Sequence, residues 1–206
     1  MVALVPTVIQ RTPRGERVAD VFSRLLEDRI VFLGSAIDDQ IADVIVAQLL
    51  HLEADDPGKD IALYINSPGG DMTALFAIHD TMQFIASDVA TICVGQACSA
   101  AAVLLAAGAP GKRAVLPNSR VLIHQPHGGA QGQSSDIELA AREMVIMRER
   151  MVDILVEHTA QSRERIQLDI DRDYIVRDEE AVAYGLVDEV LRKRRLPGRQ
   201  EAIRAS

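Results

Sequence analysis

The segment GQACSAAA, residues 95–102, decides how this 206-residue sequence folds, because it joins two elements of opposite character. Before it, residues 89–94 (VATICV) are apolar and rich in β-branched side chains, which predicts a buried strand. After it, residues 100–107 are almost all Ala, Leu and Val and stop at Gly108, which predicts a buried helix. Ser99 is therefore expected at a strand-to-helix junction, near the helix N-terminus.

That position suits two different roles for Ser99. Unpaired backbone N–H groups and the positive end of the helix dipole favour developing negative charge, which suits a nucleophile. A serine at the same place is also a common helix N-cap. The junction by itself leaves both roles open.

A second strand-to-helix junction precedes the first. Residues 61–65 (IALYI) predict a buried strand, and NSPGGD follows at residues 66–71. Two successive glycines allow a sharp turn and a close approach, and Asp71 is expected to cap a helix over residues 72–86. The loop lacks the Lys-Ser/Thr of a Walker A motif. It is interpreted either as part of an oxyanion hole or phosphate cradle, or as a tight turn alone.

The rest of the sequence predicts α/β layering with a largely parallel sheet, because strands and helices alternate from Ile30 to Val121. A long amphipathic helix with a methionine-rich stripe, read as an assembly surface, is expected over residues 135–158. The other expected elements are a loop or hairpin in residues 1–17, helices over 18–27 and from Asp38 to about 55, strands over 29–34, 120–123 and 186–190, and a helix over 179–184.

His124 and a group of carboxylates complete a possible catalytic set. His124 follows the apolar strand 120–123, and active groups gather at the carboxyl ends of parallel strands. Asp169, Asp171 and Asp173 occupy alternate positions, which would place them on one side of an extended chain. Either one of them orients a histidine, or all three belong to a solvated acidic loop. Serine, histidine and aspartate supply the three roles of acyl transfer.

Two other nucleophile arrangements fit less well. An α/β-hydrolase would order the residues as serine, acid, histidine and would place glycine at positions 97 and 101, where this chain has alanine. A Ser–Lys dyad has one lysine worth testing, Lys112, which follows the predicted nucleophile helix.

Composition excludes several classes of function. The net charge of −8 and a pI near 5.1 argue against nucleic acid or an anionic membrane as partner. The longest apolar run, residues 97–107, is too short to span a bilayer, and no secretory pattern opens the sequence. Cys93 and Cys98 are interpreted as reduced, buried thiols of a cytoplasmic protein. His51, His79 and His158 lack spaced partners, so neither a metal site nor a cofactor is expected.

Five motifs together resemble the proteolytic subunit of the bacterial Clp protease, from about Leu4 to Leu191. The resemblance implies a crotonase-like α/β fold of repeated strand-strand-helix units, with a protruding handle strand and long helix. The motifs are YINSPGG (64–70), GQACS (95–99), HQP (124–126), GQ (132–133) and YGLVD (184–188).

The same resemblance assigns the site. It implies Ser99 as nucleophile, His124 as general base and Asp173 as the acid that orients the histidine. The choice of Asp173 over Asp171 rests on this resemblance alone. The N–H groups of Gly70 and Ala100 would form the oxyanion hole.

The resemblance also implies an assembly of two stacked seven-membered rings, fed with peptides and unfolded proteins by an AAA+ unfoldase. Residues 1–17 would form an axial loop segment, residues 18–191 one peptidase domain with its handle at about 125–158, and residues 192–206 a flexible tail. Arg172 would make a ring contact. The unfoldase would dock near Tyr64, Phe84, Ile92 and Leu191.

Three departures from the family pattern bear on activity. Ser99-Ala100-Ala101 replaces the usual Ser-Met-Gly, which reshapes the pocket and resembles one of the paired subunits of actinobacterial Clp proteases, so a sister subunit is expected. Asp71 stands where a neutral residue is common, and its carboxylate would disfavour an oxyanion. Cys98 would make activity sensitive to thiol reagents. The alternatives are a structural or regulatory subunit that is inactive without a sister chain or activator, and a crotonase-like acyl-CoA enzyme.

Overall fold

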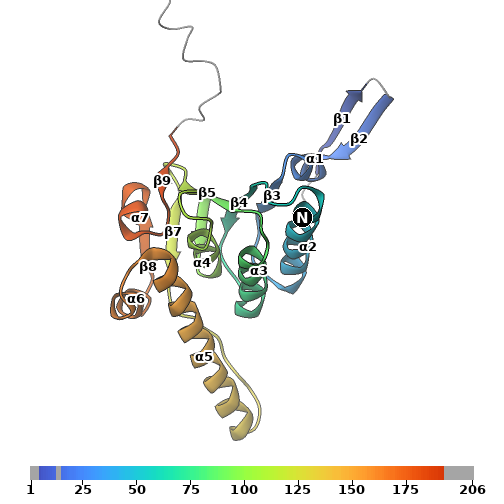
Figure 1. The fold of residues 1–206 in the computed structure, drawn as a ribbon. Helices are drawn as coiled ribbons and strands as arrows, with labels where there is room; N and C mark the ends of the chain where they lie inside the picture. Colours follow the sequence, from blue (N-terminus) through green and yellow to red (C-terminus); the bar gives the residue numbers. More distant parts are fainter. Residues whose placement is uncertain (1–4, 13–14, 193–206) are drawn as a thin grey trace, which may run out of the picture.

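The computed structural model describes residues 5–12 and 15–192 of the chain (Figure 1). Within them the fold is mixed α/β, with seven helices and a mostly parallel sheet. The elements in chain order are β1 (Thr7–Thr12), β2 (Gly15–Asp20), α1 (Val21–Glu27), β3 (Ile30–Leu33), α2 (Asp39–Asp55), β4 (Ile61–Ser67), α3 (Met72–Phe84), β5 (Val89–Cys98), α4 (Ala100–Ala106), β6 (Arg113–Val115), β7 (Arg120–Ile123), α5 (Ser134–Thr159), α6 (Arg163–Asp169), β8 (Tyr174–Arg177), α7 (Asp178–Tyr184) and β9 (Glu189–Val190).

The main sheet runs in the order β3-β4-β5-β6-β9, and its pairs along this path are parallel. β5 is long enough to pair with β6 through its first half and with β7 through its second half. β8 joins β7 antiparallel. Because β4 and β5 are central, their inward side chains Ile61, Leu63 and Ile65 are fully buried.

The helices α2, α3 and α4 lie side by side over one face of this sheet (Figure 1). The predicted caps are confirmed, since the Asp38 side chain accepts from the N–H of Ile41 and Asp71 caps α3. α4 is buried along its whole length, as its composition of Ala, Val and Leu predicts. The strand–loop–helix order of both junctions is therefore confirmed.

The N-terminal region differs from its predicted form. β1 and β2 pair in antiparallel fashion and β2 extends to Asp20, so the predicted helix over residues 18–27 begins too early. The helix starts at Val21 because the Asp20 carboxylate accepts hydrogen bonds from the N–H groups of Phe22 and Ser23. Of the predicted axial segment and tail, residues 1–4, 13–14 and 193–206 lie outside the described residues.

Three short elements escaped sequence analysis: β6, α6 and β8. Strands of three or four residues carry too little periodicity to be recognised. The segment that carries Asp169, Asp171 and Asp173 is not extended, so these alternate carboxylates do not share one side. Asp169 ends α6, which Ser162 caps, so that the three carboxylates point to different partners.

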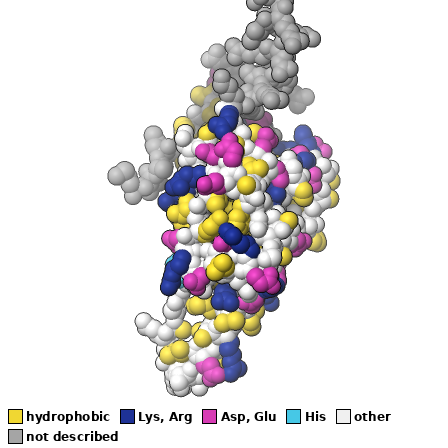
Figure 2. Space-filling view, turned by 90° about the vertical axis from the view of Figure 1, so that its left-hand side faces the viewer, with side chains coloured by type: hydrophobic (Ala, Val, Ile, Leu, Met, Phe, Trp, Pro, Cys, Tyr) yellow, Lys and Arg dark blue, Asp and Glu magenta, His cyan; other side chains and the backbone are white. Residues whose placement is uncertain are grey.

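The long helix α5 projects away from the sheet (Figure 1). Its C-terminal half is anchored in the core through Met151, Val152 and Leu155, while Leu139 and Val145 in its N-terminal half are 64% and 57% exposed. Hydrophobic side chains accordingly remain visible on this lower, projecting part of the molecule (Figure 2). Residues 124–133 run beside α5 without strand pairing to any described segment.

Candidate active site

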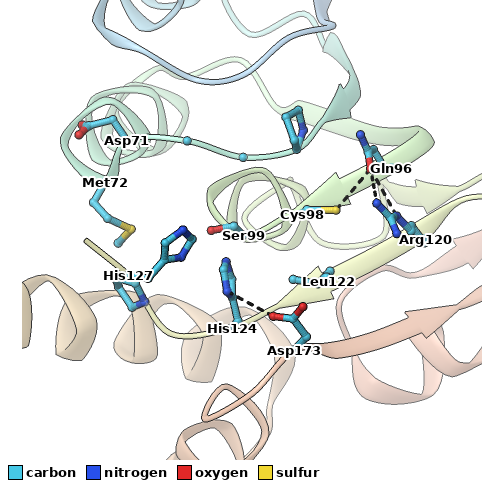
Figure 3. A pocket seen from close by; sticks show the side chains of 14 residues that line it. Asp71, Met72, Gln96, Cys98, Ser99, Arg120, Leu122, His124, His127 and Asp173 are labelled. Carbon is cyan, nitrogen blue, oxygen red and sulfur yellow. Dashed lines mark hydrogen bonds and ion pairs between the residues drawn. The ribbon is translucent and has the colours of Figure 1, made fainter. Parts of the chain in front are cut away.

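The carboxyl ends of β4, β5 and β7 meet around an open cavity of about 650 Å³ (Figure 3). Groups from all three strand ends line it, as expected for a parallel sheet. The lining residues are Pro68, Gly69, Gly70, Asp71, Met72, Gln96, Cys98, Ser99, Arg120, Leu122, His124, Pro126, His127 and Asp173.

Ser99 lies at the junction of β5 and α4 in an unusual backbone conformation, with φ 55° and ψ −124°. Its N–H donates to the Leu122 carbonyl oxygen at 2.8 Å, which fixes the turn against β7. The side chain makes no capping hydrogen bond to α4. Since positive φ in a serine costs about 1–3 kcal/mol, the turn holds the hydroxyl in the cavity at the expense of backbone strain.

The glycine loop lies directly against this turn. Gly69 has a φ of 91°, and a Cβ on it would collide with the Cys98 carbonyl oxygen and come within 2.8 Å of the Ser99 Cβ. A Cβ on Gly70 would collide with the carbonyl oxygen of Ile37. Both glycines are therefore required by the close approach of the loop to the neighbouring backbone.

The backbone N–H groups of Gly70 and Ala100 donate to no other group in the described part of the chain. Gly70 follows the loop, and Ala100 is the first residue of α4, where N–H groups have no intrahelical acceptor. Two unpaired donors beside a serine hydroxyl are the elements of an oxyanion hole.

The carboxylate of Asp71 is engaged elsewhere. It accepts hydrogen bonds from the N–H groups of Thr73 at 2.7 Å and Ala74 at 2.9 Å. Figure 3 shows this side chain at the start of α3, turned away from Ser99. The predicted repulsion of an oxyanion is weakened, because the N-terminus of α3 offsets the carboxylate charge.

His124 lies between Ser99 and Asp173 (Figure 3), with its Nδ1 3.5 Å from Asp173 Oδ1. Burial lowers the pKa of His124 below 6.5; the charge of Asp173 acts to raise it, and nearby His127 lowers it further. Ser99 Oγ makes no hydrogen bond to His124 in the described chain, and 3.5 Å exceeds a normal N–H···O distance. Ser99, His124 and Asp173 therefore lie in one cavity, but no hydrogen bonds connect them.

The other two carboxylates have their own partners. The Asp171 side chain accepts from Gln125 Nε2 at 3.5 Å. Asp169 accepts from the Tyr184 hydroxyl at 2.9 Å and from Arg165. Geometry therefore favours Asp173 as the carboxylate that faces His124.

Sequence analysis missed His127, whose ring centroid lies 5.1 Å from that of His124. Its position one residue after the HQP motif is the feature that would have revealed it. It also passed over Met72, Gln96 and Arg120, which line the same cavity. Cys98 lines it too, and burial raises the pKa of its thiol, which makes the thiol less reactive than an exposed one.

Lys112 is not near Ser99, contrary to the dyad hypothesis. Its ammonium lies 2.7 Å from Asp60 and 2.8 Å from Asp88, at the amino ends of β4 and β5. Lys112, the one lysine considered as a possible base, therefore lies at the end of the sheet opposite the cavity.

The residues predicted for assembly differ in their exposure: Ile92 is buried, whereas Arg172 and Phe84 are exposed. Arg172 is exposed and makes no ion pair in the described part of the chain. Tyr64 and Ile92 are cross-strand neighbours, Phe84 is 83% exposed at the end of α3, and Leu191 follows β9.

The described residues contain no group of three or more His, Cys, Asp or Glu side chains that could hold a metal ion. None of their helices has the length and apolar character needed to cross a membrane.

A family model described as Clp protease matches residues 13–194, which include every proposed site residue. The mixed α/β fold with its mostly parallel sheet agrees with this match. The resemblance on the five sequence motifs is thereby confirmed over most of the chain. The chain belongs to the Clp protease family and is related to its proteolytic subunit.

Proposed function

We propose that this chain is a serine endopeptidase subunit that cleaves peptides through an acyl-enzyme intermediate. Membership of the Clp protease family supports a peptidase. The observation that carries the serine mechanism is the meeting of Ser99, His124 and Asp173 with two unpaired N–H groups in one cavity.

In the proposed reaction, Ser99 Oγ attacks the scissile carbonyl carbon while His124 Nε2 accepts the hydroxyl proton. The histidine then passes this proton to the leaving amine, and water attacks the acyl-enzyme in the second half. Asp173 holds the Nδ1–H tautomer of the imidazole. The N–H groups of Gly70 and Ala100 stabilise the oxyanion, and a histidine with a lowered pKa stays neutral, and so able to accept a proton, at neutral pH.

The proposal includes the assembly and its surroundings. Two stacked heptameric rings would enclose the cavities, with residues 18–191 as the peptidase domain and residues 1–17 as axial loops. The exposed apolar side chains of α5 and the unpaired Arg172 support contacts between copies. The Tyr64–Ile92 pair, Phe84 and Leu191 would receive an AAA+ unfoldase. Cys93 and Cys98 are free, which supports a cytoplasmic site of action.

The decisive experiment is hydrolysis of a small fluorogenic peptide by the purified chain and by Ser99→Ala, together with the mass of each in solution. We expect turnover that vanishes in Ser99→Ala, at a mass near fourteen subunits and with Ser99 labelled by a fluorophosphonate. Ser35→Ala, at an exposed serine outside the cavity, is the matched control. Hydrolysis that survives Ser99→Ala would contradict the serine mechanism and favour the crotonase-like alternative.

A second candidate function is a regulatory subunit that is inactive alone. The observation favouring it is the open triad, with Ser99 unbonded to His124 and a 3.5 Å separation between His124 and Asp173. Adding a sister subunit or an activator should then turn on fluorophosphonate labelling of Ser99. A chain that labels fully and turns over by itself would exclude this function.

A further inference from the structure

One end of the site cavity carries a cation that has no acidic partner. The guanidinium of Arg120 lines the cavity and donates to Gln96 Oε1 from Nη2 at 2.8 Å and from Nε at 3.3 Å. It forms no ion pair with any carboxylate in the described part of the chain. Figure 3 places Gln96 and Arg120 together on the side of Ser99 away from Met72 and His127.

Strand register extends this cationic end across three strands. Gln96 on β5 pairs with Arg120 on β7, which in turn pairs with Arg177 on β8, so the three side chains form a row on one face. The side chains between them along the strands, Ala97, Val121 and Val176, are buried on the opposite face. The Gln96–Arg120–Arg177 row is therefore an exposed polar strip running out from the cavity.

A second row lies between this strip and Ser99. Cys98, Leu122 and Ile175 pair across the same three strands, one pleat closer to the nucleophile. Ile175 is 38% exposed, and Leu122 lines the cavity. The platform beside the serine is thus apolar near the reacting bond and cationic beyond it.

Two arginines directly opposite one another repel, and neither Arg120 nor Arg177 has a compensating carboxylate among the described residues. Asp173, which lines the same cavity, is directed to His124. Arg150 and Arg172 are also exposed without an ion pair in this part of the chain, but Arg120 and Arg177 are directly opposite one another on neighbouring strands. In a protein of net charge −8, these two neighbouring unpaired arginines form a local concentration of positive charge, which suits a carboxylate.

We propose that Gln96, Arg120 and Arg177 form a substrate subsite for a carboxylate, the side chain of Glu or Asp in the bound peptide. Gln96 fixes the Arg120 guanidinium by accepting its hydrogen bonds, and Arg177 on the neighbouring strand adds a second positive charge. The inference rests on the proposed peptidase function, because it concerns the same cavity. The row lies three residues before Ser99, or about 10 Å along an extended chain, so the acidic residue belongs two or three positions from the scissile bond.

The test uses internally quenched peptides in matched pairs that differ only by Glu or Gln at one position, scanned over three residues on each side of the cleaved bond. At one position we expect the Glu peptide to be cleaved with about three- to tenfold higher kcat/KM. The preference should disappear in Arg120→Gln, shrink in Arg177→Gln, and fall with added salt. Arg150→Gln removes an exposed arginine that also lacks an ion pair, and it should leave the ratio unchanged.

Binding separates failure of the subsite from failure of the peptidase. Fluorescence anisotropy of the same peptide pairs on Ser99→Ala reports the Glu/Gln ratio whether or not the wild type turns over. A ratio near one at every position, or a preference that persists in Arg120→Gln, overturns the subsite. A change of assembly mass in Arg120→Gln without any change of the ratio also overturns it, because the arginine would then hold a neighbouring chain.

Discussion

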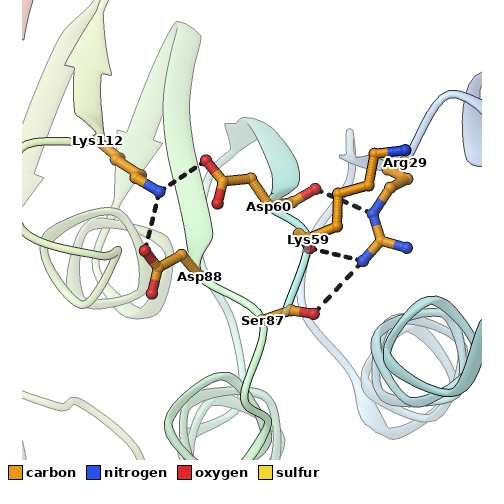
Figure 4. A network of polar contacts seen from close by, with 6 residues as sticks. All are labelled: Arg29, Lys59, Asp60, Ser87, Asp88 and Lys112. Atoms are coloured by element: carbon orange, nitrogen blue, oxygen red, sulfur yellow. Dashed lines mark hydrogen bonds and ion pairs between the residues drawn. The ribbon is translucent and has the colours of Figure 1, made fainter. Parts of the chain in front are cut away.

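The polar groups at the two ends of the parallel sheet differ in whether they have partners within the chain. At the amino ends of β4 and β5, Lys112 binds Asp60 and Asp88, and buried Arg29 donates to three carbonyl oxygens and to Ser87 (Figure 4). At the carboxyl ends, the Ser99 hydroxyl, two backbone N–H groups and Arg120 lack such partners (Figure 3). The polar groups at the amino end stabilise the fold through ion pairs and hydrogen bonds. The unpaired N–H groups and the Arg120 guanidinium at the carboxyl end would be available to a substrate.

This contrast has a thermodynamic meaning. A partly buried polar group without a partner costs about 1–3 kcal/mol, so a fold optimised only for stability would pair it. The unpaired groups all face one cavity, where a peptide carbonyl and carboxylate would satisfy them. Substitutions at the two ends should therefore change different quantities: activity at one and the free energy of unfolding at the other.

The largest effect is expected from Asp173→Asn at the carboxyl end. It should lower kcat by about 10⁴-fold with little change in stability, because the imidazole tautomer is no longer held. Asp171→Asn is the matched control, since that side chain contacts Gln125 instead of His124. Peptide hydrolysis and thermal unfolding of both variants measure this, and an equal loss in the two would contradict the assignment.

Gly69→Ala should come next. The added Cβ meets the Cys98 carbonyl oxygen and the Ser99 Cβ at a φ of 91°, which displaces the oxyanion donors. We expect a loss of about 10²–10³-fold in kcat, comparable to removal of one donor. Gly129→Ala, where a Cβ meets nothing within 4 Å, should retain full activity.

At the amino end, Arg29→Met should lower the free energy of unfolding by about 3 kcal/mol, because three carbonyl oxygens lose their donor. Denaturant titrations at one fixed protein concentration measure this. Activity per folded molecule should stay unchanged. Arg150→Met, at an exposed site, is the control. A similar loss of unfolding free energy in that variant would mean that the hydrogen bonds of Arg29 have no special role in stability.

The pH profile should respond to His127. Because burial lowers the pKa of His124 from its ordinary value of 6.5, the acid limb of kcat/KM should lie below that value. Replacing His127 by Asn removes a side chain that lowers the pKa of His124, so the acid limb should move to higher pH. A limb that stays in place, or moves to lower pH, would show that His127 does not act on His124.

The smallest effect is expected for Lys112→Met. Its ion pairs with Asp60 and Asp88 are solvent-exposed, so thermal unfolding should shift only slightly and less so at high salt. Peptide hydrolysis should not change at all. A large loss of activity would support the Ser–Lys hypothesis. It would also contradict the assignment of stability to the amino ends of the strands and activity to their carboxyl ends.

Much of the fold could be predicted because its long elements carry strong local patterns. Central strands such as β4 are continuous apolar runs, and helices such as α3 begin at a side-chain cap such as Asp71. β6, β8 and α6 could not be found, because they are too short for a period and exist through pairing or packing with distant segments. The start of α1 was misplaced because β2 extends to Asp20.

The sequence by itself determined the α/β class and the two strand-to-helix junctions, and it made Ser99, His124 and the glycine loop candidates, because these depend on residues adjacent in the chain. Only the tertiary structure decided which aspartate faces His124, that Lys112 lies at the opposite end of the sheet, and that His127 and Arg120 border the cavity. Those facts depend on strand register and on where α6 ends, which join segments far apart in sequence. A one-residue shift in either would turn a different side chain toward the serine.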